Sequence, residues 1–325
     1  MTFGKRFSLA AFFFAACSSS AFAQGQGTDF GKIEILTERI APNLFMLSGS
    51  AGADPAHEDA AGGRIGILSG PDGIFMVDSQ YAPLGPKVAA AIAKIGPGPI
   101  RYLVNTHIHG DHTAGNAFFV KMGAVLLARE ELRNEMLNPP LPASGIRAPA
   151  PEPARVPTIT YGMGAPLKFR MNGEIVDVIP VRAAHTGGDT MIRFENANVI
   201  MIGDFYRNYG YPYIDTANGG TLKGAIDALD QVYKLAAPNT KLIPGHGTII
   251  NREDLLPYRD MILAVQSKVR QMIAEGKTEQ QVLAAKVTAP YDAKVPGGLL
   301  PAGGSGTSAD RFVAMVYSEL KRGGK

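Results

Sequence analysis

Five of the six histidines in this chain lie in three of four short polar stretches, and each stretch follows an apolar run typical of a strand. The densest stretch, residues 106–112, reads Thr-His-Ile-His-Gly-Asp-His and places four potential metal ligands within six residues. The other three stretches contain His185, Asp204 and His246, each near a glycine that lets the backbone approach a site closely. Packing alone does not require such a set. A shared metal centre requires a fold in which these four strand ends meet.

Imidazole and carboxylate groups together suit zinc, with iron or manganese as less preferred alternatives. A tetrahedral zinc ion takes about four ligands, so seven candidates are too many for one ion and about right for two. We therefore predict a two-metal site. The first ion would be held by His107, His109 and His185, and the second by Asp111, His112 and His246, with Asp204 bridging the two.

The N-terminal residues have the pattern of an export signal. Lys5 and Arg6 precede an apolar stretch over residues 7–16, and the small-residue pattern at 21–23 predicts cleavage after Ala23. The apolar stretch is too short to be a permanent membrane span. We therefore expect a signal peptide at 1–23 and a periplasmic or secreted mature protein that starts at Gln24.

The chain has a single cysteine, Cys17, which lies inside the predicted signal peptide. A lipid anchor at Cys17 is the alternative to cleavage after Ala23, although Phe14 is an unfavourable residue three places before it. Cleavage after Ala23 leaves a mature protein without cysteine, which excludes disulfides and thiolate ligands. Any bound metal must then rely on nitrogen and oxygen ligands.

The composition is that of an ordinary globular protein, with 46% hydrophobic and 19% charged residues and a net charge of +3. Two of the basic residues belong to the predicted signal peptide, which reduces the net charge further. Nothing in this balance favours nucleic acid or a charged membrane surface as a partner. We expect a small-molecule substrate, and the sequence leaves the oligomeric state open.

Short apolar runs separated by turn signals predict an α/β fold with two groups of strands, each followed by helices. The predicted strands are 65–68, 73–77, 100–104, 124–128, 167–170, 175–179, 191–194, 199–202 and 241–243. The predicted helices are 86–95, 221–235, 254–275, 278–285 and 309–321. We assign residues 24–325 to one hydrolase domain with a helical extension over about 252–325. The proline-rich segment 138–157 is interpreted as a surface loop over the site.

The His-x-His-x-Asp-His motif at 107–112, followed in order by His185, Asp204 and His246, resembles the metallo-β-lactamase superfamily. The resemblance extends from about Ile33 to His246. It implies an αβ/βα four-layer sandwich of two mixed β-sheets, with helices on both outer faces and the metals at one edge between the sheets. It also implies the division of ligands given above. Asp78 matches a position that supports the metal loop in the family, and a simple turn residue is the alternative.

Two zinc ions that share a water molecule lower its pKa from ~15.7 towards ~7, which gives hydroxide at neutral pH. This hydroxide would attack a carbonyl carbon, while a metal ion holds the developing oxyanion. Asp111 is expected to accept the proton of the attacking water. We therefore predict an enzyme, a secreted dinuclear zinc hydrolase that opens an amide, ester or thioester carbonyl of the β-lactam or lactone class.

The superfamily hosts several reactions, and individual residues separate its branches. Di-iron electron-transfer members carry Glu at the position of His109, which disfavours that branch. Nucleases carry an added domain and a basic face, and alkylsulfatases carry a large C-terminal extension, so these two branches are disfavoured as well. Asp204 resembles the bridging carboxylate of glyoxalase-II-like thioesterases and lactonases, whereas many true β-lactamases carry Cys or Ser there. Export favours a β-lactam, so both substrate classes stay open. The remaining alternatives are a periplasmic single-iron sulfur oxidoreductase and a non-catalytic accessory protein of a quinoprotein system.

The aromatic segment 205–213 follows Asp204 and is predicted to contact substrate. Arg207 suits a carboxylate, and Tyr206 and Tyr209 are suited to hydrogen bonding or ring stacking. The alternative is an aromatic strand edge with a solvated arginine. His57, in the loop 54–63, is interpreted as a surface residue, with a role at the rim of the site as the alternative.

Overall fold

The structure of the chain is a computed structural model that describes residues 29–50, 61–141, 149–302 and 306–323. The predicted signal peptide, Cys17 and His57 lie outside these ranges, as does part of the proline-rich segment 138–157. The described part of that segment includes a 3₁₀ turn, η3 (Pro153–Arg155). No helix within the described ranges is long and apolar enough to span a membrane.

Within the described residues, the first sheet has seven strands in the order β1 to β7. The first four strands pair antiparallel, and the pairs from β4 to β7 are parallel, so the sheet is mixed. Its strands are β1 (Ile35–Ala41), β2 (Leu44–Gly49), β3 (Ile65–Leu68), β4 (Ile74–Val77), β5 (Ile100–Val104), β6 (Val125–Arg129) and β7 (Ile159–Tyr161).

The second sheet has five strands within the described residues, in the order β12-β11-β10-β9-β8. Only β11 and β12 are parallel. Its strands are β8 (Leu167–Met171), β9 (Glu174–Pro180), β10 (Thr190–Phe194), β11 (Val199–Gly203) and β12 (Lys241–Pro244). Asn172 and Gly173 join β8 to β9 with φ angles of 56° and 74°, the left-handed turn that an Asn-Gly pair predicts.

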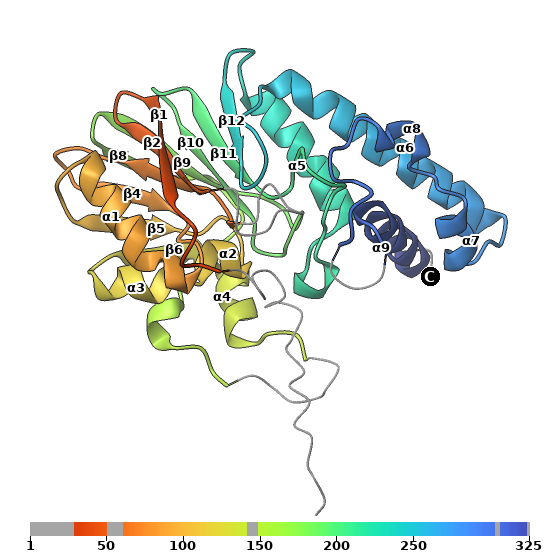
Figure 1. Cartoon of the computed structure of the whole chain (residues 1–325), viewed down its shortest axis with the longest axis horizontal. Coiled ribbons are helices and arrows are strands. Elements are labelled where there is room, and N and C mark those ends of the chain that lie inside the picture. The colour runs from red at the N-terminus through yellow and green to blue at the C-terminus, as the bar shows by residue number, and fades with distance from the viewer. Residues whose placement is uncertain (1–28, 51–60, 142–148, 303–305, 324–325) are drawn as a thin grey trace, which may run out of the picture.

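Three hydrophobic layers hold the sheets and helices together (Figure 1). The central layer lies between the sheets, where Phe75 and Val104 of the first sheet join Phe194 and Val176 of the second. The outer face of the first sheet is covered by α1 (Gly85–Ile95) and α3 (Asn116–Lys121). Two shorter helices, α2 (Gly110–Thr113) and α4 (Glu130–Leu137), follow β5 and β6.

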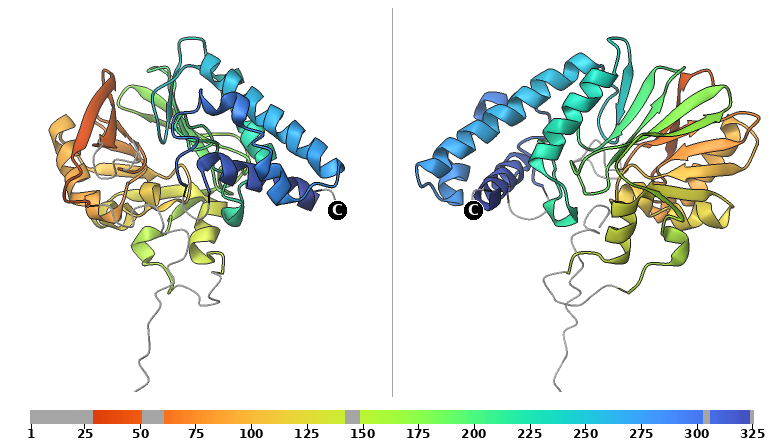
Figure 2. Two further views of the ribbon diagram at one scale, coloured as in Figure 1. Left: turned by 45° about the vertical axis from the view of Figure 1, so that its right-hand side comes forward. Right: turned by 180° about the vertical axis from the view of Figure 1, so that it is seen from behind.

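The outer face of the second sheet is covered by the C-terminal helices, which gather on one side of the sandwich (Figure 2). These are α5 (Leu222–Leu235), α6 (Leu255–Ala274), α7 (Glu279–Ala284), α8 (Ala289–Asp292) and α9 (Ser308–Gly323). Val265 of α6 and Phe312 of α9 share one core with Ile200 and Ile202 of β11. The helices after His246 are therefore built onto the sandwich through a continuous core.

The predicted αβ/βα sandwich is confirmed, with two mixed sheets between helical layers. The predicted strand and helix ends agree with the structure to within two residues. Strands β1, β2 and β7 and the short helices α2, α3, α4 and α8 were not predicted from the sequence. Strand β7 has only three residues, and α2 begins within the ligand motif itself, so neither carries a periodic pattern of its own.

Candidate metal centre

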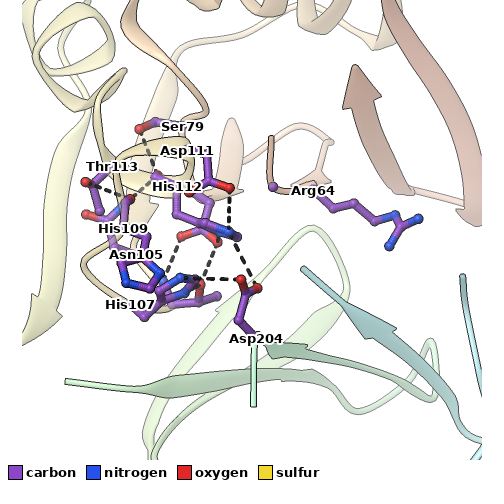
Figure 3. Close-up of polar contacts among 12 residues, drawn as sticks. Arg64, Ser79, Asn105, His107, His109, Asp111, His112, Thr113 and Asp204 are labelled. Atoms are coloured by element: carbon purple, nitrogen blue, oxygen red, sulfur yellow. Dashed lines mark hydrogen bonds and ion pairs between the residues drawn. The ribbon is translucent and has the colours of Figure 1, made fainter. Parts of the chain in front are cut away.

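The seven predicted ligands follow the ends of four strands and come together at one edge of the sandwich. Figure 3 shows His107, His109, Asp111, His112 and Asp204 at this edge. The motif 107–112 follows β5, and His185 follows β9. Asp204 and His246 follow the parallel strands β11 and β12 directly, so they leave the second sheet at the same edge. Asp204 therefore faces the histidines of the first sheet across the gap between the sheets.

Among the described side chains, the ligand atoms fall into two groups, each within 4.8 Å. The first group consists of His107, His109, His185 and Asp204, and the second group of Asp111, His112 and His246. Asp204 also reaches the second group, because its carboxylate lies 3.5 Å from His112 Nε2 and 3.3 Å from His246 Nε2. The geometry thus places one carboxylate between two ligand groups, as expected of a bridging residue.

Asp78 fixes two of the histidines from behind. It follows β4 in a left-handed conformation (φ 60°) and accepts hydrogen bonds from the backbone amide and the hydroxyl of Thr106, both at 2.7 Å. Since that hydroxyl hydrogen goes to Asp78, the Thr106 oxygen is left to accept from His107 Nδ1 at 3.1 Å. Asp78 also accepts from His112 Nδ1 at 2.8 Å. Both imidazoles therefore present an unprotonated Nε2 to the site when they are neutral.

His109 and His185 are oriented in the same way by other acceptors. His109 Nε2 donates to the Asp215 carboxylate at 2.9 Å, and His185 Nδ1 donates to the Tyr213 carbonyl at 2.5 Å. Their inner nitrogens, His109 Nδ1 and His185 Nε2, then face each other at 2.9 Å. Two lone pairs at this distance repel each other, and a cation held by both relieves the repulsion.

Further observations fit a metal centre. Three atoms of the predicted ligands are among the buried atoms without a hydrogen-bond partner in the described residues: His107 Nε2, Asp111 Oδ1 and Asp204 Oδ1. Unpaired polar atoms in a protein interior are costly, and here all three belong to ligand-type side chains. Glycine also makes room for these ligands. A side chain at Gly63 would overlap the His112 ring at 2.1 Å, and one at Gly245 would overlap Asp204 Oδ1 at 2.0 Å.

The histidines of the two ligand groups differ in their pKa values and therefore in their charge. Burial lowers the pKa of His107 well below its usual value and that of His185 to about 3, so both are neutral. Burial acts in the same direction on His112 and His246, but the carboxylates of Asp204 and Asp111 outweigh it and raise their pKa values to about 9 and about 10. The same pairs hold the pKa of Asp111 and Asp204 well below the usual range, despite burial. A metal ion that binds the second group must therefore displace the protons of His112 and His246.

The residues predicted to contact substrate have different surroundings. Tyr206 is buried in the core with its ring 4.6 Å from that of Tyr258, so its position does not support the predicted substrate contact. The Tyr209 ring packs close to Gly297. Arg207 donates from Nε to the Tyr209 carbonyl at 2.7 Å and is half-buried.

Asp215 and Arg311 were not identified from the sequence, and Tyr213 was predicted only as part of the aromatic segment 205–213. Asp215 holds His109, Tyr213 stacks its ring on that of His109 at 5.7 Å, and Arg311 lies over the Tyr213 ring at 4.4 Å. Asp215 also accepts from the amides of Ala217 and Asn218 at the start of η4 (Thr216–Asn218). This turn signal is visible in the sequence, but it gives no information about the contact with His109.

The sequence matches the model of the Metallo-beta-lactamase superfamily over residues 63–246, which is more than half of the chain. The chain belongs to the metallo-beta-lactamase superfamily. The resemblance carried by the ligand motif is thereby confirmed, and with it membership in a superfamily of metal-dependent hydrolases. The match ends at His246, before the helices α6 to α9. No curated protein matches the chain.

Solved structures of the superfamily share this fold. The DIM-1 metallo-beta-lactamase is 16% identical with a TM-score of 0.55, over 71% of this chain and 99% of that one. TTHA1429 from Thermus thermophilus, a metallo-beta-lactamase family protein, is 17% identical with a TM-score of 0.64, over 88% and 95%. The sec-alkylsulfatase Pisa1 from Pseudomonas sp. is 15% identical with a TM-score of 0.64, over 87% and 50%. At these identities the likeness establishes the fold of the superfamily.

Asp215→Asn is expected to weaken metal binding by the first group. Asparagine keeps an oxygen for the amides of η4 but removes the charge that orients His109, and loss of such a partner lowers metal affinity by about 10- to 100-fold. Competition with a chromophoric chelator, using Zn²⁺ as the probe, measures this change. Asp227→Asn, in an exposed pair with Lys223, is the control. Equal affinities in both variants would contradict the role of Asp215.

The two groups should bind Zn²⁺ with different pH dependence. Because His112 and His246 have raised pKa values, an ion entering the second group displaces their protons at any pH below about 9. Its affinity should therefore fall by about tenfold per displaced proton for each unit that the pH decreases. His107 and His185 have lowered pKa values and hold no protons to displace, so the first group should respond less. Zinc titrations between pH 6 and 9 that show equal slopes for both ions would refute this difference.

Proposed function

We propose that this protein is a dinuclear zinc hydrolase that opens an amide, ester or thioester carbonyl of a small molecule. The observation that carries the proposal is the position of Asp204. Its carboxylate lies 3.7 Å from both His107 Nε2 and His185 Nε2, and also within 3.3 Å of His246 Nε2. One carboxylate within reach of two complete ligand groups is what a pair of ions requires.

His107, His109 and His185 would hold one ion and Asp111, His112 and His246 the other, with Asp204 shared. When bound, such ions supply a water of lowered pKa and polarise a carbonyl oxygen. Zinc suits this set of nitrogen and oxygen donors, with iron or manganese as the alternatives. Metal analysis of the purified protein should give two equivalents per chain, and one equivalent would contradict the proposed pair.

Asp111 is proposed to accept the proton of the attacking water. Its carboxylate is buried, and in the metal-free protein it is ionised at neutral pH because the protonated His112 and His246 lower its pKa. Oδ2 lies 3.0 Å from His246 Nε2, whereas Oδ1 has no partner among the described residues. The residue therefore has one oxygen for the second group and one free to take a proton.

The alternatives differ in how many of these ligands they use. A single-iron sulfur oxidoreductase would need only one group, yet the second group is as deeply buried as the first. An accessory protein without turnover has no physical reason to keep all seven side chains oriented. Among hydrolysable substrates, Asp204 favours an ester or thioester. The likeness to solved lactamases of the same fold leaves a β-lactam as the alternative substrate.

Asp111→Asn should lower turnover by roughly 10²- to 10⁴-fold, the range for losing a general base. The assay is hydrolysis of a chromogenic cephalosporin and a chromogenic lactone by the mature domain, zinc-loaded and chelated. Chelation should abolish turnover of whichever compound is a substrate. Asp260→Asn, exposed on α6, is the control. Chelator-insensitive turnover, or near-normal turnover by Asp111→Asn at full zinc content, would refute the mechanism.

We also propose that the chain acts in the periplasm or outside the cell. The basic pair Lys5 and Arg6, the apolar stretch 7–16 and the small-residue pattern ending at Ala23 support export. The protein expressed from its full-length sequence should be recovered outside the cytoplasm with Gln24 as its first residue. N-terminal sequencing measures this, and a first residue at Cys17 would instead favour the lipid anchor.

A further inference from the structure

Arg311 belongs to α9, outside the segment that the family model matches, yet it lies against Tyr213, a neighbour of the metal centre. Its guanidinium carbon lies 4.4 Å from the centre of the Tyr213 ring. That ring is stacked on His109, and the Tyr213 carbonyl accepts from His185. One aromatic residue therefore connects Arg311 to two histidines of the first group.

The start of α9 packs against the segment that carries Tyr211 and Tyr213. The Tyr211 amide donates to Ser308 Oγ at 2.9 Å, and the Tyr211 ring stacks on Phe312 with their planes 13° apart. Further along the helix, Glu319 accepts from the amide of Leu222 at 2.8 Å. Arg311 lies between Ser308 and Phe312, so its position beside Tyr213 is fixed by packing on both sides.

Arg311 and Arg207 form a pair of like charges without a counter-ion. Within the described part of the chain, Arg207 donates to the Tyr209 carbonyl and Arg311 lies against Tyr213, and neither guanidinium forms an ion pair with a carboxylate. Arg311 Nε is buried without a hydrogen-bond partner. Burial and the neighbouring Arg207 lower the pKa of Arg311 to about 10, which leaves it charged at neutral pH. The adjacent carboxylate of Asp310 is used by Thr307 and Lys286.

We propose that Arg311 and Arg207 together bind a carboxylate of the substrate, next to the carbonyl that is hydrolysed at the metal centre. This inference rests on the function proposed above and narrows it to anionic substrates. Partly buried guanidinium groups with free donors match a carboxylate in charge and in planar geometry. Tyr213 contacts both Arg311 and His109, so this carboxylate site lies one aromatic residue away from the first group.

The test compares two substrates that differ only in the anion. The probes are a chromogenic cephalosporin with its ring carboxylate free and the same compound as its carboxamide. The ratio of kcat/KM for the acid to kcat/KM for the amide is measured for the zinc-loaded wild type and for Arg311→Gln. Loss of a hydrogen bond to a charged group should lower this ratio by about 10- to 100-fold. A ratio within twofold of the wild type would overturn the proposal.

Three further variants complete the design. Arg322→Gln, exposed at the end of the same helix, should keep the wild-type ratio. Arg311→Lys keeps the charge but loses the planar fork, so its ratio should fall between those of the wild type and Arg311→Gln. Arg207→Gln tests the second guanidinium, should lower the ratio in the same direction, and serves if Arg311→Gln does not fold.

Binding to the metal-free protein separates this proposal from the proposed function. Without metal no hydrolysis occurs, and calorimetry then compares the binding of acid and amide directly. The wild type should bind the acid more tightly, and Arg311→Gln should lose that preference. If the zinc-loaded wild type hydrolyses neither compound but its metal-free form prefers the acid, the carboxylate site stands and lactam hydrolysis fails. Equal binding of acid and amide, or binding of neither, refutes the carboxylate site.

Discussion

The buried carboxylate of Asp204 is the interaction on which the arrangement of this site depends. It leaves the second sheet at the end of β11 and faces His107 and His112, which belong to the first sheet. A carboxylate in the interior is unfavourable unless it is paired or bound to a metal, so the two halves of the sandwich must close around cations. The sheets are joined by an apolar core along most of their area, and this charged contact determines which edge becomes the site.

Most ligands of the metal centre could be predicted because they lie in short sequence motifs next to predicted strands. The motif 107–112 places four ligands within six residues, and each other ligand lies in a short polar stretch that follows an apolar strand. The contacts that orient the ligands instead join residues that are far apart in the sequence. Asp215 is 106 residues from His109, and only the path of the loop after β11 brings them to 2.9 Å. A single aspartate at the start of a turn has the same sequence pattern whether or not its second oxygen reaches a histidine.

Tyr206 shows that the type of a residue does not predict the direction of its side chain. An aromatic residue two places after a metal ligand is consistent with a substrate contact, but the structure uses it to pack α6 onto the second sheet through Tyr258. Tyr213, in the same segment, faces the histidines instead. Sequence pattern does not decide between these two tyrosines, because the segment 205–213 has no regular secondary structure and its side chains follow no fixed period.

The charge balance of the site supports the proposal of an anionic substrate. In the metal-free protein, Asp111 and Asp204 are compensated by the protons that they hold on His112 and His246. Two divalent ions that displaced those two protons would bring four positive charges in exchange for two, so the loaded centre would be more positive by two charges than the metal-free one. Arg207 and Arg311 then add two further positive charges at its rim. A neutral substrate would leave this charge unbalanced, whereas a substrate with a carboxylate neutralises part of it as it binds.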